Sequence, residues 1–267
     1  MKKYIFPIII SVFLFTSCSE YQKLLKSTDP ELKYDKGVEY FNAKKYTKAI
    51  TLLDEVSTYY KNSDRSEMIL NFLAQAYMAR KDYYSASEYY KTYVKSYPRG
   101  RFIQEARFGV AYCYYLDSPD VRLDQENTNL AISSLQEFID LYPESERTKE
   151  AAKLLDELND KLAKKGLINA ELYYNLGTYL GRNNYLAAVI EAENALKKYP
   201  ATRLREDLMI LILKAKYQQA LLSYAETKVD RYQSAIDEYY NYINEFPTGK
   251  FRKEADDMLK VSEKNIK

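Results

Sequence analysis

The sequence predicts an all-α protein, built as a right-handed solenoid of five helical pairs over residues 30–265. Three observations favour this class. Glycine and proline are scarce, at seven each in 267 residues, so few turns between strands are available. Apolar residues recur at the spacing of amphipathic helices. An aromatic residue followed by proline occurs four times. Stacking is expected because one helical pair cannot bury its apolar face alone.

The repeat is defined by an alanine that lies twelve residues before a proline. It occurs as Ala86 with Pro98, Ala131 with Pro143, Ala188 with Pro200 and Ala235 with Pro247. Three of these alanines follow a tyrosine by three residues, namely Tyr83, Tyr185 and Tyr232. A further copy opens the series with Tyr46 and Ala49, and there Lys61 replaces the proline. Four of the seven prolines occupy one repeat position, which chance explains poorly.

Each copy is expected to contain an amphipathic helix that ends at the proline. In the stretch 129–142, the apolar residues follow the i, i+3/i+4, i+7 spacing of one helix face. They are Ala131, Ile132, Leu135, Phe138, Ile139 and Tyr142. The small alanine lets a preceding helix approach closely. The proline ends the helix because it cannot continue the hydrogen-bond ladder.

Three element boundaries can be placed. Asp29 followed by Pro30 predicts a helix start, with a capping side chain before a proline at the first helical position. The polar stretch 117–128 predicts an exposed loop that interrupts the third pair. Residues 145–165 predict a long charged helix that is closed by Gly166 as a C-terminal cap.

The first eighteen residues predict export rather than a membrane span. Lys2 and Lys3 precede an apolar run over 4–15, which is shorter than the about 20 residues that a spanning helix needs. Small residues at 16–17 come directly before Cys18. The arrangement resembles a bacterial lipoprotein signal. An ordinary signal peptide with an incidental cysteine is the alternative.

The lipoprotein resemblance implies that residues 1–17 are removed and that Cys18 becomes the lipidated first residue. Several acyl chains would then attach the protein stably to a membrane, whereas a single chain binds only marginally. Residues 18–29 would form a lipidated tether ahead of the repeat domain at 30–265. Ser19 favours the outer membrane, by resemblance to the proteobacterial sorting pattern.

Composition argues against catalysis. The chain has no histidine, so the commonest general base and metal ligand is missing. Cys113 lies in an apolar stretch and is expected to be a buried, inert thiol. We predict no cofactor, no metal site and no enzyme activity. Without Lys2 and Lys3 the basic and acidic side chains balance, and no basic block predicts binding to nucleic acid or anionic lipid.

The repeats resemble those of the tetratricopeptide family. The residues at that family's spacing are Gly37, Tyr40 and Ala49 in the first copy and Ala74, Tyr77 and Ala86 in the second. The steps between successive repeat alanines are 37, 45, 57 and 47 residues. All are longer than the family's repeat of about 34 residues, which indicates lengthened helices and insertions. The resemblance implies that an extended or helical peptide docks on the concave surface of the solenoid.

Beyond its repeats, the chain resembles the BamD lipoproteins of the outer-membrane β-barrel assembly machinery. The resemblance is carried by Cys18, the aromatic stretch 111–115, the polar stretch 118–125, the segments 161–164 and 170–174, and the Tyr-Pro-Glu-Ser pattern at 142–145. It implies a scaffold that is anchored by lipid in the cell outer membrane and faces the periplasm. The implied partners are a BamA-type insertase, other assembly lipoproteins and unfolded outer-membrane proteins. Repeats at about 172–260 would bind the insertase, and repeats at about 31–98 would engage the unfolded proteins.

Two other functions remain as alternatives. One is a cell-envelope tetratricopeptide lipoprotein that coordinates peptidoglycan and outer-membrane processes. The other is a SusD-like glycan-binding lipoprotein, which the absence of tryptophan disfavours. The tyrosine pairs 59–60, 89–90, 173–174 and 239–240 are expected to pack between helices, with a peptide-binding surface as the alternative. Tyr34 and Val38 stand where a carboxylate clamp needs lysine and asparagine, so that ligand class is not expected.

Overall fold

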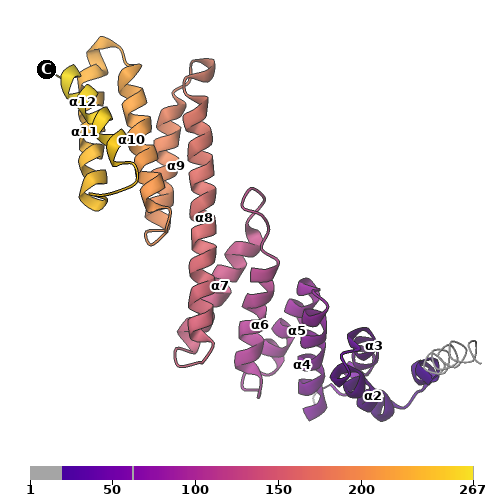
Figure 1. The fold of residues 1–267 in the computed structure, drawn as a ribbon. Coiled ribbons are helices and arrows are strands. Elements are labelled where there is room, and N and C mark those ends of the chain that lie inside the picture. The colour runs from indigo at the N-terminus through magenta and orange to yellow at the C-terminus, as the bar shows by residue number, and fades with distance from the viewer. Residues whose placement is uncertain (1–19, 62, 267) are drawn as a thin grey trace, which may run out of the picture. The chain divides into compact units, whose positions relative to one another are not determined.

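A computed structural model describes residues 20–61 and 63–266 (Figure 1). These residues form helices and contain no strand, so the predicted all-α class is confirmed. The helices are α2 (Pro30–Asn42), α3 (Tyr46–Ser57), α4 (Asp64–Ala79), α5 (Tyr83–Ser96), α6 (Ile103–Leu116), α7 (Glu126–Leu141), α8 (Thr148–Leu176), α9 (Asn184–Lys198), α10 (Arg205–Leu221), α11 (Ala225–Glu245) and α12 (Arg252–Asn265), with a 3-10 turn η1 (Tyr179–Gly181).

The chain divides into two compact units. Unit 1 takes the chain up to Ser118 together with Glu126–Ala152, and unit 2 takes Pro119–Gln125 together with Lys153 onward. Within unit 1, each helix from α2 to α7 packs against the next one along the chain. Within unit 2, α10 packs against α9, α11 and α12. Sequence neighbours are therefore also spatial neighbours, as in a stack of helical hairpins.

The repeat alanines lie buried between packed helices. Ala49, Ala86, Ala131 and Ala188 are completely buried, and Ala235 is 1 % exposed. Around Ala49 the core of unit 1 is aliphatic, with Leu53, Ile69 and Leu73 among its buried members. A small side chain at such a position leaves room for the neighbouring helix to pack closely. The burial of all five agrees with the sequence-based explanation of the alanine.

Helix α10 is the centre of unit 2. Its residues from Leu208 to Leu213 are all buried, so this stretch of the helix is covered on every side. One side of α10 packs with Ala170 of α8 and Ala192 of α9. Its other side packs with Tyr239 and Tyr242 of α11 and with Met258 of α12. A helix that is apolar all round is stable in water only when neighbours cover every face.

The prediction that Gly166 caps a helix is wrong. Helix α8 continues through it to Leu176. A Cβ at position 166 would lie 2.7 Å from the Cβ of Ala195 on α9. The glycine therefore serves the close approach of two helices in unit 2 rather than a helix end. The cost of glycine inside a helix is about 1 kcal/mol, which the tertiary packing offsets.

The polar loop is shorter and more ordered than predicted. It ends at Gln125, because residues 126–128 form the first turn of α7 and Thr128 is fully buried. The Gln125 amide donates to the carbonyl oxygens of Asp120 at 2.8 Å and Leu123 at 3.1 Å. The Lys165 ammonium on α8 also donates to the Leu123 carbonyl at 2.6 Å. These side chains satisfy backbone groups that have no partner in a helix.

At the N-terminus, the predicted start of α2 is confirmed. The Asp29 carboxylate accepts hydrogen bonds from the backbone N–H groups of Glu31 at 2.9 Å and Leu32 at 3.2 Å. Part of the expected tether is itself helical, over residues 20–26. The buried Lys33 ammonium of α2 donates to the Leu25 carbonyl at 3.1 Å and forms an ion pair with Glu55. The segment after residue 19 is thus packed onto unit 1.

Each aromatic–proline pair forms the same chain reversal. The aromatic residue adopts φ −129° and ψ 62° at Tyr97, −126° and 66° at Tyr199, and −124° and 68° at Phe246. Its conformation is not helical because a following proline disfavours the α region. The carbonyl of the aromatic residue then accepts from the N–H three residues later, at 2.9 Å for Gly100 and 3.1 Å for Gly249. Proline at the second place and glycine at the fourth are the preferences of a type I turn.

A buried tyrosine fixes two of these reversals to the preceding helical pair. In unit 2, the Tyr242 hydroxyl of α11 donates to Glu206 of α10 at 2.8 Å and accepts from the Phe251 N–H at 3.3 Å. In unit 1, the Tyr93 hydroxyl of α5 bonds to Glu67 of α4 and accepts from the Phe102 N–H at 2.8 Å. Burial, together with the bond to Glu206, raises the pKa of Tyr242 to about 12. The phenol therefore stays protonated and can donate.

Gly249 is required where this tyrosine meets the turn. A Cβ at position 249 would lie 2.6 Å from the Tyr242 hydroxyl and 2.9 Å from the Cβ of Phe246. We expect Gly249→Ala to lower the free energy of unfolding by about 1–3 kcal/mol, because the buried tyrosine cannot move away without losing its bonds. Urea unfolding followed by circular dichroism measures this change. The control is Thr248→Ala in the same turn, an exposed site where we expect a change within about 0.5 kcal/mol. Equal stability of both variants would contradict the role of Gly249.

Candidate partner-binding surfaces

The predicted lipidation site lies outside the described residues. Cys18 precedes residue 20, where the described part of the chain begins, so its modification stays a prediction. In that described part, no helix combines the length and the apolarity that crossing a bilayer requires. The same residues contain no cluster of acidic or cysteine side chains that could hold a metal ion.

Cys113 is buried, as predicted. It is 1 % exposed on α6 and packs with Tyr90 and Ala106. Burial raises the pKa of its thiol to about 12, and the nearby Asp117 carboxylate acts in the same direction. The reactive thiolate is therefore not populated at neutral pH, and Cys113 acts as a small apolar side chain.

The tyrosine pairs divide between the interior and the surface. Tyr90 and Tyr239 are buried, at 5 % and 4 % exposure. Tyr89 stacks on Tyr77 with ring centroids 5.3 Å apart and donates its hydroxyl to Asp54 at 2.5 Å. Tyr173 and Tyr174 pack against the core of unit 2. Each pair thus contributes at least one ring to packing, which confirms the main expectation, while Tyr59 and Tyr240 remain exposed.

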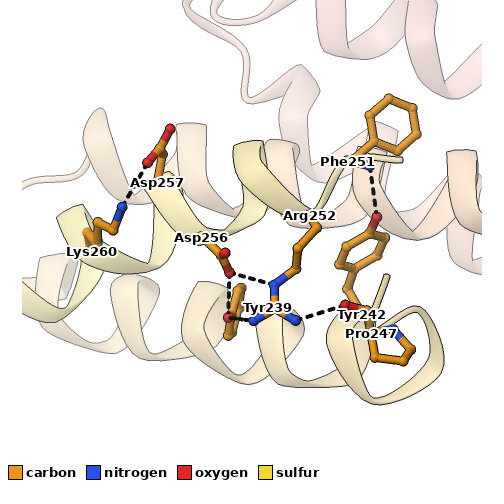
Figure 2. A network of polar contacts seen from close by, with 8 residues as sticks. All are labelled: Tyr239, Tyr242, Pro247, Phe251, Arg252, Asp256, Asp257 and Lys260. Atoms are coloured by element: carbon orange, nitrogen blue, oxygen red, sulfur yellow. Dashed lines mark hydrogen bonds and ion pairs between the residues drawn. The ribbon is translucent and has the colours of Figure 1, made fainter. Parts of the chain in front are cut away.

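Helices α11 and α12 are joined by a polar network (Figure 2). The Asp256 carboxylate accepts from the Tyr239 hydroxyl at 2.7 Å and from Arg252 Nε at 2.8 Å. Arg252 also donates to the Pro247 carbonyl at 3.0 Å, which ties the network to the turn before α12. These donors hold the pKa of Asp256 below its ordinary value, the Tyr239 hydrogen bond first and Arg252 second. The role of Asp256 here is structural, because it joins α11 to α12.

Unit 2 exposes apolar side chains at one end, which we term the apolar rim. The rim comprises Leu176, Leu180, Leu222 and Tyr224. It lies on the α8–α9 and α10–α11 connections, which Figure 1 shows at the same end of the unit. Leu180 is 76 % exposed and Tyr224 is 84 % exposed. Leu180 also has a φ of 55°, a backbone conformation that residues other than glycine rarely adopt. Clustered exposed apolar side chains mark an interaction surface more often than scattered ones do.

Each unit also contains a groove between successive helices. The groove in unit 1, here termed the basic groove, measures about 230 Å³ and is lined by Lys91, Val94, Lys95, Arg107, Val110, Ser134, Glu137 and Phe138. The groove in unit 2, here termed the acidic groove, measures about 650 Å³ and is lined by Glu193, Leu196, Arg205, Met209, Ile212, Glu238, Asn241, Asn244 and Glu245. Sequence reasoning missed both, although the repeat register contains the signal.

Comparison with known proteins identifies the family. The model of one family, described as YfiO, outer membrane lipoprotein, matches residues 26–228. The chain belongs to this family. The match covers unit 1 from residue 26 and reaches the first turn of α11 in unit 2, so the basic groove lies wholly within it. The resemblance that the sequence motifs carried is confirmed.

Two relatives of this YfiO family member are outer membrane protein assembly factors named BamD. The protein from Caulobacter vibrioides is 27 % identical over 198 residues, which are 73 % of this chain and 65 % of the relative's length. The protein from Rickettsia prowazekii is 24 % identical over 221 residues, which are 79 % of this chain and 86 % of the relative. A solved complex of the yeast Sti1 TPR2AB domain aligns with 88 % of this chain and 98 % of that chain, at 14 % identity and a TM-score of 0.38.

The Asp256 network predicts a stability effect that depends on pH. The folded-state pKa of Asp256 is lowered, so its contribution is fully present above the ordinary aspartate value of about 3.9 and is lost as pH falls through the lower folded value. We expect Asp256→Asn to be less stable than the parent at neutral pH, and the difference to shrink in acid. Urea midpoints at several pH values measure it. The control is Asp257→Asn on the exposed side of α12, and a pH-independent gap for Asp256→Asn would contradict the assignment.

Proposed function

We propose that this YfiO family member is an outer-membrane assembly factor, a scaffold that binds a BamA-type insertase and unfolded outer-membrane proteins and catalyses no reaction. The observation that carries the proposal is the family match over most of the chain, together with two relatives named as assembly factors. The described residues supply no metal cluster, and the thiol they contain is buried, which is consistent with a binding role.

The proposal assigns the insertase to unit 2 and the unfolded proteins to unit 1. In unit 2, the apolar rim is the surface best suited to a folded partner, because it presents exposed leucine and tyrosine side chains on short connections between packed helices. Aromatic side chains in the centre of an interface contribute much of its binding energy. The stacked helices behind the rim fix the backbone on either side of these connections, which lowers the cost of ordering them on binding.

Attachment to the membrane is assigned to Cys18, within a family that is described as outer membrane lipoproteins. We expect Cys18→Ser to leave the folded units intact and to move the protein from the membrane fraction to the soluble fraction after cell lysis, because acyl chains supply the affinity. Fractionation with metabolic labelling by a fatty acid measures both effects. Membrane retention of an unlabelled Cys18→Ser protein would show that another feature anchors the chain.

The partner assignment is tested by capture of the tagged, lipidated protein from native envelopes in mild detergent, with mass spectrometry of what is recovered. We expect a stoichiometric BamA-type insertase. The variant Leu222→Ser with Tyr224→Ser should lower that recovery at least tenfold, because it removes apolar side chains from the rim. Tyr59→Ser, an exposed tyrosine of unit 1, is the matched control and should leave recovery unchanged. Recovery of peptidoglycan synthases or glycan importers in place of an insertase would overturn the proposed function.

A further inference from the structure

The basic and acidic grooves occupy the same place in the repeat. Counted from the proline that ends each preceding helix, Lys91 and Glu193 both lie seven residues before it. The same count places Val94 with Leu196, Arg107 with Met209, Val110 with Ile212, and Ser134 with Glu238, the last pair counted from the next proline. The basic groove therefore lies between α5 and α7, with α6 between them as its floor. The acidic groove lies in the same way between α9 and α11, with α10 as its floor.

The apolar positions of this register are kept, while the charge is reversed at one position and lost where Met209 corresponds to Arg107. The shared apolar lining is Val94 and Val110 in unit 1, and Leu196 and Ile212 in unit 2. At the edge of the groove, Lys91 in the basic groove corresponds to Glu193 in the acidic groove. Since this one repeat position is a lysine in unit 1 and a glutamate in unit 2, its charge is not a requirement of the fold. It sets what each groove can bind.

The carboxylates of the acidic groove already have partners within unit 2. Lys216 lies 2.6 Å from Glu238 and 3.8 Å from Glu193, and Arg205 pairs with Glu245. At the first copy of the repeat the equivalent groove is closed by its own hydrogen bond, from the Tyr89 hydroxyl to Asp54. In the acidic groove and at the first copy of the repeat, these carboxylates therefore have partners within the chain.

The basic groove differs because its cations exceed its carboxylates. Lys91 pairs with Glu88 at 2.7 Å, and Arg107 Nη1 pairs with Glu137 at 2.5 Å. Lys95 has no ion-pair partner among residues 20–61 and 63–266. The Arg107 side chain is 25 % exposed, so part of its guanidinium is open to an acceptor from outside the chain. A hydrogen bond to a charged group contributes about 1.5–3 kcal/mol.

We propose that the basic groove binds a peptide segment of a partner protein in which apolar side chains alternate with carboxylates. Its volume of about 230 Å³ is below the about 300–1,000 Å³ of small-molecule sites, so it fits one or two side chains of a larger ligand. An apolar side chain would contact Val94, Val110 and Phe138. A flanking carboxylate would accept from Arg107 and lie near Lys95. This inference goes beyond the proposed function, since it holds whichever protein supplies the segment.

The test uses the full-length lipidated protein in mild detergent and a short fluorescein-labelled peptide in which phenylalanines alternate with glutamates. We expect saturable binding measured by fluorescence anisotropy, weakened by salt. The double variant Lys91→Glu with Arg107→Met installs the residues that unit 2 has at the same positions. It should raise the Kd at least tenfold, which corresponds to 1.4 kcal/mol. Lys95→Glu changes an exposed side chain only and should weaken binding in the same direction.

Two controls make the result decisive. Lys149→Glu makes the same charge change on an exposed residue of unit 1 outside the groove, and the parent Kd is expected. Glu193→Lys changes the acidic groove and should also leave the basic groove's affinity unchanged. Three results would overturn the proposal: equal weakening by Lys149→Glu, an unchanged Kd in both groove variants, or displacement of the peptide by phosphatidylglycerol vesicles through the same residues. Failure to capture an insertase would overturn the proposed function and leave this binding result standing.

Discussion

The aromatic–proline reversal is the constraint on which the rest of the molecule depends. A proline forces the residue before it out of the helical region, so the helix ends at a fixed residue and the chain turns back. In two of the reversals a tyrosine hydroxyl then bonds at once to a carboxylate of one helix and to the N–H of the residue that precedes the next helix. One side chain thus gives that backbone N–H an acceptor and fixes three successive helices together.

Packing follows from these reversals. The turn fixes where the next helix starts. The same position of each repeat, such as Ala86 or Ala188, is therefore buried against a neighbouring helix and carries only a methyl group. Glycine replaces alanine where the approach is closer still, as at Gly166 against Ala195. The stretch of α10 from Leu208 to Leu213 can be buried on every side only because α9, α11 and α12 all reach this helix. Buried area rather than helix propensity therefore stabilises each unit, as in other helical-repeat proteins.

Function on such a scaffold lies in the positions that the packing leaves free. The basic and acidic grooves have apolar residues at the same repeat positions and differ in charge. The charged residues at the edges of the grooves therefore vary without affecting the fold. The same holds for the apolar rim of unit 2, where Leu222 and Tyr224 contribute little to the core. A repeat architecture by itself thus specifies no partner, and the side chains grafted onto it do.

The sequence by itself determined the helical class, the repeat register, the capped start at Asp29 and the buried thiol of Cys113, because each depends on local spacing or composition. Family resemblance was also visible in short motifs. Only the tertiary structure decided why Gly166 is a glycine, where the polar loop ends, and that Arg107 and Lys91 converge on one groove. Those features depend on contacts between residues about 30 or more positions apart, or on which face of a helix a neighbour covers. Periodicity along one chain cannot specify either, since it describes one element at a time.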